Sequence, residues 1–179
     1  MVQEIGTPPN MAALADRLAI QEVLATHSRG IDRCDSEVLK SCYWPDAEVD
    51  YGAFKGSAHE FAGMVTAVLA DQFQLTQHRI SNTLIALAGS EARSESLCTA
   101  YHLLTDGSEE MTFSGRYLDL LERREDRWKI RHRQVVMDWS RRWTVADERD
   151  SDAFADLAKG SNTSDDPSYA LFTGRSPGG

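Results

Sequence analysis

The hydrophobic period of this chain changes from 3.6 to 2 between Phe73 and Gln77, and this change constrains the fold more than any other feature. Before it, apolar residues recur at helical spacing, as in the stripe formed by Ile20, Leu24 and Ile31. After it, four runs alternate between apolar and polar residues and are separated by short turns. Helices followed by such a meander predict an α+β domain, with the helices on one face of a curved antiparallel sheet.

The expected elements follow from this patterning and from the turn residues. We expect helices at 11–34, 36–43 and 57–73, and strands at 47–51, 77–87, 92–105, 111–124 and 127–139. Asn10 is a suitable cap for the first helix, and Pro45 prevents the second from continuing because proline has no amide hydrogen. The buried face of the third helix is expected to consist of Phe61, Met64, Val65, Val68 and Leu69.

Composition limits the classes of function. The length of 179 residues suits one domain, and a net charge of −9 disfavours nucleic-acid binding. No apolar run approaches membrane-spanning length, and the first ten residues lack the segments of a signal peptide. Three cysteines without a CxxC spacing fit reduced thiols. We therefore expect a cytoplasmic protein with a small-molecule partner, and neither a nucleic-acid nor a membrane partner.

The two ends of the chain differ in composition from the rest. Residues 1–10 are expected to form a loose leader, residues 11–143 the domain, and residues 144–179 a polar C-terminal tail. Within that tail, Ser168–Phe172 is a short apolar island. The tail is either disordered or a docked arm, and burial of Leu171 and Phe172 would favour docking.

Asp32 and His78 are the strongest candidates for chemistry. Asp32 ends the first helix, where a carboxylate is unfavourable with the helix dipole, so another interaction is expected to hold it there. His78 opens the first long strand and shares a face with Ile80 and Asn82. A carboxylate that orients an imidazole is a common device for proton transfer. By itself, a lone histidine here would more often be a core residue.

Further polar candidates lie on the strands. Tyr51 ends the first strand, where its phenol can donate to a carbonyl. In the last strand Arg133 shares a face with Met137, opposite the face of Trp128 and Ile130, and it is either a cation facing a substrate oxygen or half of a salt bridge. The five histidines lie on separate elements without metal-binding spacing, so we expect no metal. The residues expected to contact substrate are His27, Asn82, His102, Phe113, Tyr117 and Met137.

Seven short motifs together resemble the SnoaL-like branch of the NTF2-like superfamily. They are Arg17–Gln21, Gly30–Arg33, Asp46–Tyr51, Gln77–His78, Gly115–Tyr117, Glu122–Arg124 and Trp128–Ile130. Each motif is weak alone, and their order and spacing are specific for the fold. The resemblance implies a cone, in which a strongly curved antiparallel sheet encloses a pocket closed by N-terminal helices.

Within this branch, the chain resembles the group of scytalone dehydratase, a bile-acid 7α-dehydratase and hexachlorocyclohexane dehydrochlorinase. The resemblance implies that Asp32 supports His78, and that Tyr51 and Arg133 match a tyrosine and an arginine of group members. His102 is the nearest match to a second histidine of scytalone dehydratase. His27 departs from the group, where tyrosine or lysine is frequent, so a different substrate is expected.

The functional hypothesis is a cofactor-independent lyase. Its Asp32–His78 dyad would abstract a proton and eliminate a group, with dehydration favoured, from a hydrophobic cyclic, steroid-like or aromatic hydroxylated substrate. The same residues could serve an isomerase, a polyketide cyclase or a formaldehyde-releasing lyase. An alternative of another class is a non-catalytic ligand-binding or assembly subunit. By analogy with the group we expect a homo-oligomer, with a trimer favoured.

Overall fold

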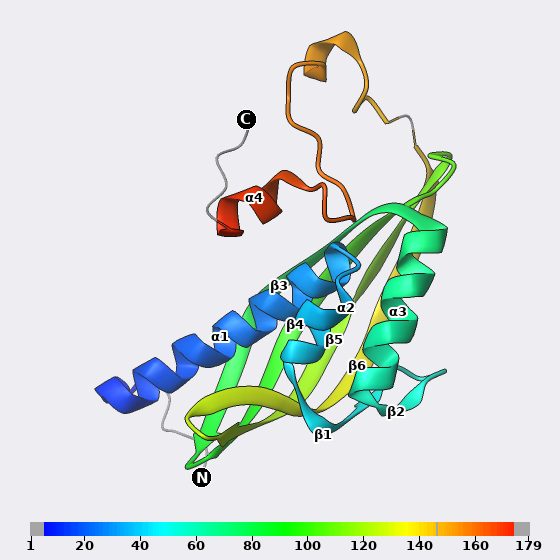
Figure 1. Ribbon diagram of the computed structural model, residues 1–179. Helices are drawn as coiled ribbons and strands as arrows, with labels where there is room; N and C mark the ends of the chain where they lie inside the picture. The colour runs from blue at the N-terminus through cyan, green and yellow to red at the C-terminus, as the bar shows by residue number, and fades with distance from the viewer. Residues whose placement is uncertain (1–5, 146, 174–179) are drawn as a thin grey trace.

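The computed structural model describes residues 6–145 and 147–173 and contains a curved six-stranded sheet with helices packed on one face (Figure 1). The helices are α1 (Met11–Asp32), α2 (Ser36–Ser41), α3 (Ala58–Gln72), the 3-10 helix η1 (Asp152–Phe154) and α4 (Pro167–Thr173). The strands are β1 (Tyr43–Asp50), β2 (Lys55–Ser57), β3 (Phe73–Ala88), β4 (Glu91–Leu104), β5 (Glu109–Arg124) and β6 (Arg127–Thr144). The predicted α+β class and the curved sheet are confirmed.

The strand order is β2-β1-β6-β5-β4-β3. From β3 to β6 the strands pair antiparallel in sequence order, as the meander pattern predicts. In contrast, β1 lies parallel to β6, with a register irregularity between Tyr43 and Glu48. Pro45 lies inside that irregularity and cannot donate a ladder hydrogen bond. The strand begins before the proline, four residues earlier than expected at Ala47.

Side-chain caps define the helices that position Asp32. Asn10 accepts from the amide of Ala13 at 2.9 Å and begins α1, and Asp35 caps α2. Gly30 lets the two helices touch, because a Cβ built there would lie 2.8 Å from the backbone nitrogen of Leu39. The short α1–α2 connection thus fixes the end of α1, where Asp32 lies.

Bulges in two long strands change the face of the sheet on which the later side chains lie. In β3, the register with β4 shifts between Ser81 and Leu84, and Asn82 takes a positive φ of 46°. His78 and Ile80 therefore face the helices, but Asn82 and Leu84 are exposed. The expectation that Asn82 shares a face with His78 was wrong, because the bulge changes the alternation.

In β6, the register with β5 shifts where Leu120 pairs with His132 and Leu121 pairs with Ile130. As a result, Ile130 and Arg133 are both buried, and the prediction that they lie on opposite faces was wrong. A second shift follows near Gly115, which pairs with Met137. Met137 is 62 % exposed and lies outside the core.

The main hydrophobic core lies between the helices and the inner face of the sheet. It includes Ile20, Leu24, Ile31, Leu39, Tyr43, Phe61, Leu121, Trp128 and Ile130. Helix α3 turns Ala58, Ala62 and Thr66 inward, and Met64 and Val68 are exposed, so the predicted buried face was only partly correct. Small residues at four-residue spacing allow this helix to approach its neighbours closely. No helix among the described residues is long and apolar enough to span a bilayer.

The C-terminal segment extends away from β6 and returns to α1, where α4 lies (Figure 1). Three polar contacts join this arm, residues 147–173, to the end of α1. Arg29 donates to Ser168 at 2.7 Å, Tyr169 donates to Asp35 at 2.8 Å, and Arg33 forms an ion pair with Asp166 at 3.3 Å. Leu171 and Phe172 are 72 % and 73 % exposed in the single chain, and the guanidinium of Arg29 lies 5.0 Å from the ring centroid of Phe172. Residues 1–5 of the expected leader lie outside the described residues.

Candidate active site

Asp32 and His78 meet at the junction between α1 and β3. Nδ1 of His78 lies 2.7 Å from Oδ1 of Asp32, and the two side chains are 9 % and 12 % exposed. The backbone amide of His78 also donates to this carboxylate, at 2.9 Å to Oδ2 and 3.1 Å to Oδ1. An ionised carboxylate accepts hydrogen bonds only, so this network assigns the proton to Nδ1 and leaves Nε2 as the basic nitrogen.

His102 lies beside the dyad on β4. Its ring centroid is 5.5 Å from that of His78, and the rings are nearly perpendicular. Burial lowers the pKa of His102 to about 4, with a smaller contribution from His78. Nδ1 of His102 is buried and has no hydrogen-bond partner among the described residues. His102 is therefore a neutral histidine that lies beside the dyad.

A buried ion pair lies on the neighbouring strands. Arg133 donates through Nε to Oδ1 of Asp119 at 2.7 Å and through Nη2 to Oδ2 at 2.8 Å. The guanidinium also lies 4.1 Å from the ring centroid of Tyr117. Burial opposes the charge of Arg133, but Asp119 raises its pKa well above the usual value. Of the two readings of Arg133 from sequence, the structure contains the salt bridge.

His27 completes this polar cluster from α1. Nη1 of Arg133 lies 2.9 Å from both ring nitrogens, and Nε2 lies 2.8 Å from Oη of Tyr43. Burial, together with the charges of Arg133 and His78, lowers the pKa of His27 well below its usual value. His27 is therefore neutral, and protein partners already occupy its polar atoms.

Tyr51 places a phenol against the core. Its ring stacks on Phe61 with centroids 4.0 Å apart, and its Oη is buried with no hydrogen-bond partner among the described residues. Burial raises the pKa of Tyr51, and the charge of Arg133 opposes that shift. The side chains of Arg133 and Tyr43 also act on this pKa, so Tyr51 lies beside the polar cluster of His27 and Arg133.

Most of the predicted site residues fall into two clusters, and Tyr51 lies against Phe61. The structure brings together Asp32, His78 and His102, and it brings together His27, Arg133 and Tyr117. Phe113 lies on the inner face with Ile80 and Val135. Asn82 and Met137 do not join these groups, since both are exposed. Among the described residues, no cluster of three or more His, Cys, Asp or Glu side chains is arranged to hold a metal ion.

Three polar residues of the site were not predicted, Asp119, Thr76 and Tyr43. Asp119 lies directly opposite Arg133 in the β5–β6 register. Its inward position follows from alternation with Tyr117, so a correct register would have identified it. Thr76 precedes His78 by two residues on the same face, and its Oγ1 donates to Oδ1 of Asp32 at 3.0 Å. The spacing of two residues between Thr76 and His78 in one strand could have indicated that their side chains lie on the same face.

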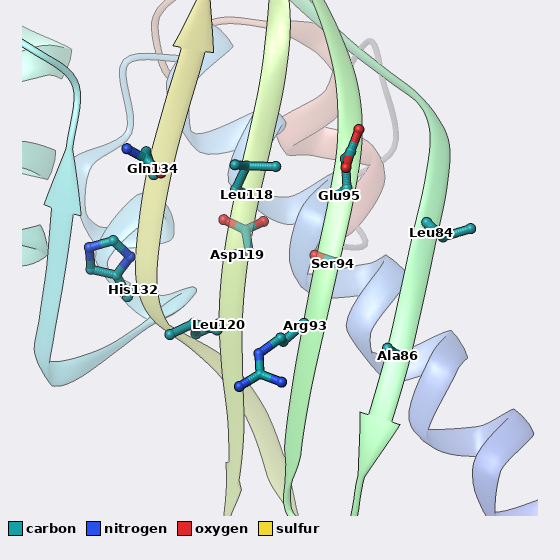
Figure 2. Close-up of a pocket in the computed structure, with 10 residues that line it drawn as sticks. All are labelled: Leu84, Ala86, Arg93, Ser94, Glu95, Leu118, Asp119, Leu120, His132 and Gln134. Carbon is teal, nitrogen blue, oxygen red and sulfur yellow. The ribbon is translucent and has the colours of Figure 1, made fainter. Parts of the chain in front are cut away.

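A hollow of about 430 Å³ lies on the other face of the sheet, opposite α1 (Figure 2). Leu84, Leu118 and Leu120 line it, together with His132 and Gln134. These outward-facing side chains belong to strand positions that alternate with those of the dyad. We assign the candidate site to the inner face, where the titratable side chains with unpartnered atoms lie.

Comparisons with known proteins agree with this architecture. The sequence signature of the SnoaL-like domain matches residues 12–134. The uncharacterized protein Rv2910c of Mycobacterium tuberculosis is 28 % identical over 125 residues, which cover 68 % of this chain and 84 % of that protein.

Solved structures share the fold at low identity. The hexachlorocyclohexane dehydrochlorinase LinA-type3 of Novosphingobium barchaimii has a TM-score of 0.68 and 22 % identity, covering 75 % of this chain and 94 % of that one. A variant of Rv3472, a protein of unknown function from Mycobacterium tuberculosis, has a TM-score of 0.66 and 18 % identity, covering 84 % and 89 %. The predicted cone-type fold is confirmed.

Proposed function

Because this chain belongs to the SnoaL-like family of the NTF2-like superfamily, we propose that it is a cofactor-independent lyase with Asp32 and His78 as its catalytic dyad. The observation that carries this proposal is the 2.7 Å contact between Nδ1 of His78 and Oδ1 of Asp32. This contact directs the basic Nε2 atom away from the carboxylate. No hydrogen bond within the described residues occupies Nε2, so the atom is available to a substrate proton.

The reaction begins with proton abstraction by Nε2 of His78 from a carbon next to a carbonyl or an aromatic system. Asp32 stabilises the resulting imidazolium and keeps the ring orientation fixed. General-base catalysis of this kind contributes about 10²–10⁴-fold in rate. In a dehydration, the C–H electron pair becomes the new double bond, the C–O bond breaks, and the imidazolium returns its proton to the leaving hydroxyl. The products are an alkene and one water.

Tyr51 is the proposed donor to the developing oxyanion. Its buried hydroxyl has no partner among the described residues, and hydrogen-bond donors act strongly where water is excluded. We assign Arg133 an indirect role, because Asp119 and His27 contact all three of its nitrogens. Its positive charge favours the anionic form of Tyr51 and so strengthens the hydrogen bond that the phenol donates.

The remaining inner-face residues define the proposed substrate contacts. His102 supplies the unpartnered Nδ1, and Phe113 and Tyr117 supply aromatic surface. Met137 lies at the exposed end of the same face. This combination of apolar walls and few polar atoms suits a hydrophobic cyclic or aromatic substrate that carries hydroxyl or carbonyl oxygens.

The test is turnover of a panel of hydroxy-steroids and phenolic or polyketide hydroxyketones, with mass spectrometry to detect loss of one water. We expect His78→Ala to abolish turnover and Asp32→Asn to lower kcat by about 10³–10⁴, as for a triad whose orienting carboxylate is lost. His132→Ala is the matched control, because that histidine lines the outer hollow. Wild-type rates in both dyad variants would overturn the proposal. A product of unchanged mass would identify an isomerase or a cyclase, and release of formaldehyde would identify that lyase instead.

We further propose that residues 11–143 form the catalytic domain, that 144–179 form its polar C-terminal tail, and that the protein is a homo-oligomer, with a trimer favoured. Trp139 and Trp143 support this assembly, since both are exposed large apolar side chains on β6. Light scattering at micromolar concentration should detect the oligomer. A single species of 19.9 kDa would contradict it.

A further inference from the structure

We propose that Thr76 is a positioning residue, which holds the carboxylate of Asp32 in the orientation that the dyad requires. Its Oγ1 donates to Oδ1 of Asp32 at 3.0 Å, the same oxygen that accepts from Nδ1 of His78. This inference rests on the proposed function, because it concerns the same dyad. Thr76 acts through Asp32 and is assigned no contact with the substrate.

The carboxylate of Asp32 is held by donors from a single strand. Thr76 and His78 are two residues apart on β3, so their side chains lie on the same face. The Thr76 hydroxyl, the His78 amide and the His78 ring together provide donors to both carboxylate oxygens. Rotation of the carboxylate would break all of these contacts at once. The hydroxyl therefore fixes the direction in which Oδ1 meets the imidazole.

A structural role alone does not account for the hydroxyl of Thr76. Threonine is common in strands because of its branched Cβ, and valine would serve that purpose as well. Another buried threonine of this chain shows the alternative. Thr66 donates to the carbonyl of Ala62, four residues earlier in its own helix, at 2.8 Å. By contrast, Thr76 donates across 44 residues of sequence to a buried carboxylate.

Loss of the hydroxyl should change the orientation of the carboxylate. With one donor fewer, the carboxylate of Asp32 can rotate, and the hydrogen bond from Nδ1 of His78 loses its fixed direction. The backbone amide of His78 remains as a donor, so Thr76→Val keeps part of the network.

The first experiment needs no substrate and follows the Nδ1 proton of His78 by NMR at a fixed pH. Thr76→Val should change the chemical shift of this proton or broaden its signal, and Thr76→Ser should restore the wild-type signal, because a charge-assisted hydrogen bond to the shared oxygen is lost and then regained. Thr66→Val is the matched control, since both threonines are buried, with exposed fractions of 4 % and 6 % for Thr66 and Thr76. It should leave the signal unchanged.

The second experiment measures kinetics on the substrate found with the panel. Thr76→Val should lower kcat between about tenfold and a hundredfold with KM nearly unchanged, the size expected for one hydrogen bond to a charged group. Thr76→Ser should recover most of that loss, and Thr66→Val should keep the wild-type kcat. If Thr76→Val does not fold, Thr76→Ala supplies the same comparison, because it also lacks the hydroxyl.

The outcomes separate this inference from the proposed function. A wild-type Nδ1 proton signal and a wild-type kcat in Thr76→Val, with Asp32→Asn inactive, would overturn the role of Thr76 and leave the dyad intact. Wild-type rates in both Asp32→Asn and His78→Ala would instead overturn the proposed function. A loss that Thr76→Ser does not restore would also overturn the inference, since it would not depend on the hydroxyl.

Discussion

Arg133 and Asp119 lie directly opposite each other on β6 and β5 and form a bidentate ion pair whose side chains are 1 % and 0 % exposed. Burial of both charges carries a large desolvation cost, which their mutual contact offsets only when both partners are present. Arg133 also contacts His27, so the pair connects the sheet to α1.

Asp119→Ala should lower the free energy of unfolding by about 3–5 kcal/mol, because it leaves the guanidinium buried without its partner. Urea denaturation followed by circular dichroism measures this change. Glu109→Ala is the matched control, since its ion pair with Arg142 is exposed, and it should cost less than about 1 kcal/mol. Equal effects of the two variants would contradict the importance of the buried pair.

Stability should decrease in mild acid because of His102. Its pKa lies near 4 in the folded protein and near 6.5 when unfolded, so below pH 6.5 only the unfolded chain gains the proton. The resulting loss of stability grows as pH falls from 6.5 to about 4, up to about 3 kcal/mol, and then levels off. His27 acts in the same direction, since its pKa is also lowered by burial.

His102→Gln should reduce that acid sensitivity, because glutamine does not bind a proton in this range. Urea denaturation of the wild type and the variant at pH 7.5, 5.5 and 4.5 provides the comparison. The difference in the free energy of unfolding between the wild type and the variant should become smaller, or change sign, as the pH falls from 7.5 to 4.5. If the free energy of unfolding decreased equally with falling pH in both proteins, His102 would be protonated in the folded state at little cost.

The two interior helical glycines should respond oppositely to alanine. A Cβ at Gly30 would meet the backbone of Leu39 at 2.8 Å, so Gly30→Ala should destabilise the protein by about 1–3 kcal/mol. A Cβ at Gly63 meets nothing within 4 Å, so Gly63→Ala should stabilise the protein by about 0.5–1 kcal/mol. Thermal denaturation of both variants tests whether the first loses stability and the second gains it.

Gly30→Ala should also lower activity more than Gly63→Ala does at a temperature where both are folded. Gly30 lies two residues before Asp32, and separation of α2 from α1 would shift the carboxylate. Unchanged kcat in a folded Gly30→Ala variant would indicate that α2 does not position the dyad.

Truncation after Gly160 should lower stability only modestly, by about 1–2 kcal/mol. It removes three polar contacts to the end of α1, those made by Asp166, Ser168 and Tyr169, and partly exposed contacts of this kind contribute little each. Turnover should fall by more than this small loss of stability explains, because the residues that receive these contacts, Arg29, Arg33 and Asp35, flank Asp32 in the sequence. Leu171→Ser is the control and should be nearly silent, since Leu171 is exposed.

The sequence predicted the elements of this fold better than their faces. Periodicity located α1, α3 and the four long strands, and the helix-end position of Asp32 pointed to its contact with His78. Alternation failed at the bulges, because one extra residue turns every later side chain to the other face. Asn82 and Ile130 were misassigned for this reason. The partnership of Arg133 with Asp119 depends on that register, which no local pattern of residues specifies.

Strand β3 forms one edge of the sheet, and an open edge of 16 residues is a surface on which another chain can add a strand. Three side chains occupy its free backbone groups. Arg17 donates to the carbonyl of Ile85, Asn162 donates to the carbonyl of Phe73, and Asp32 accepts from the amide of His78. The proposed catalytic carboxylate thus also protects the molecule against edge-to-edge aggregation. Replacement of Asp32 by alanine would uncover that amide, whereas asparagine retains an acceptor, so Asp32→Ala should aggregate more during expression than Asp32→Asn does.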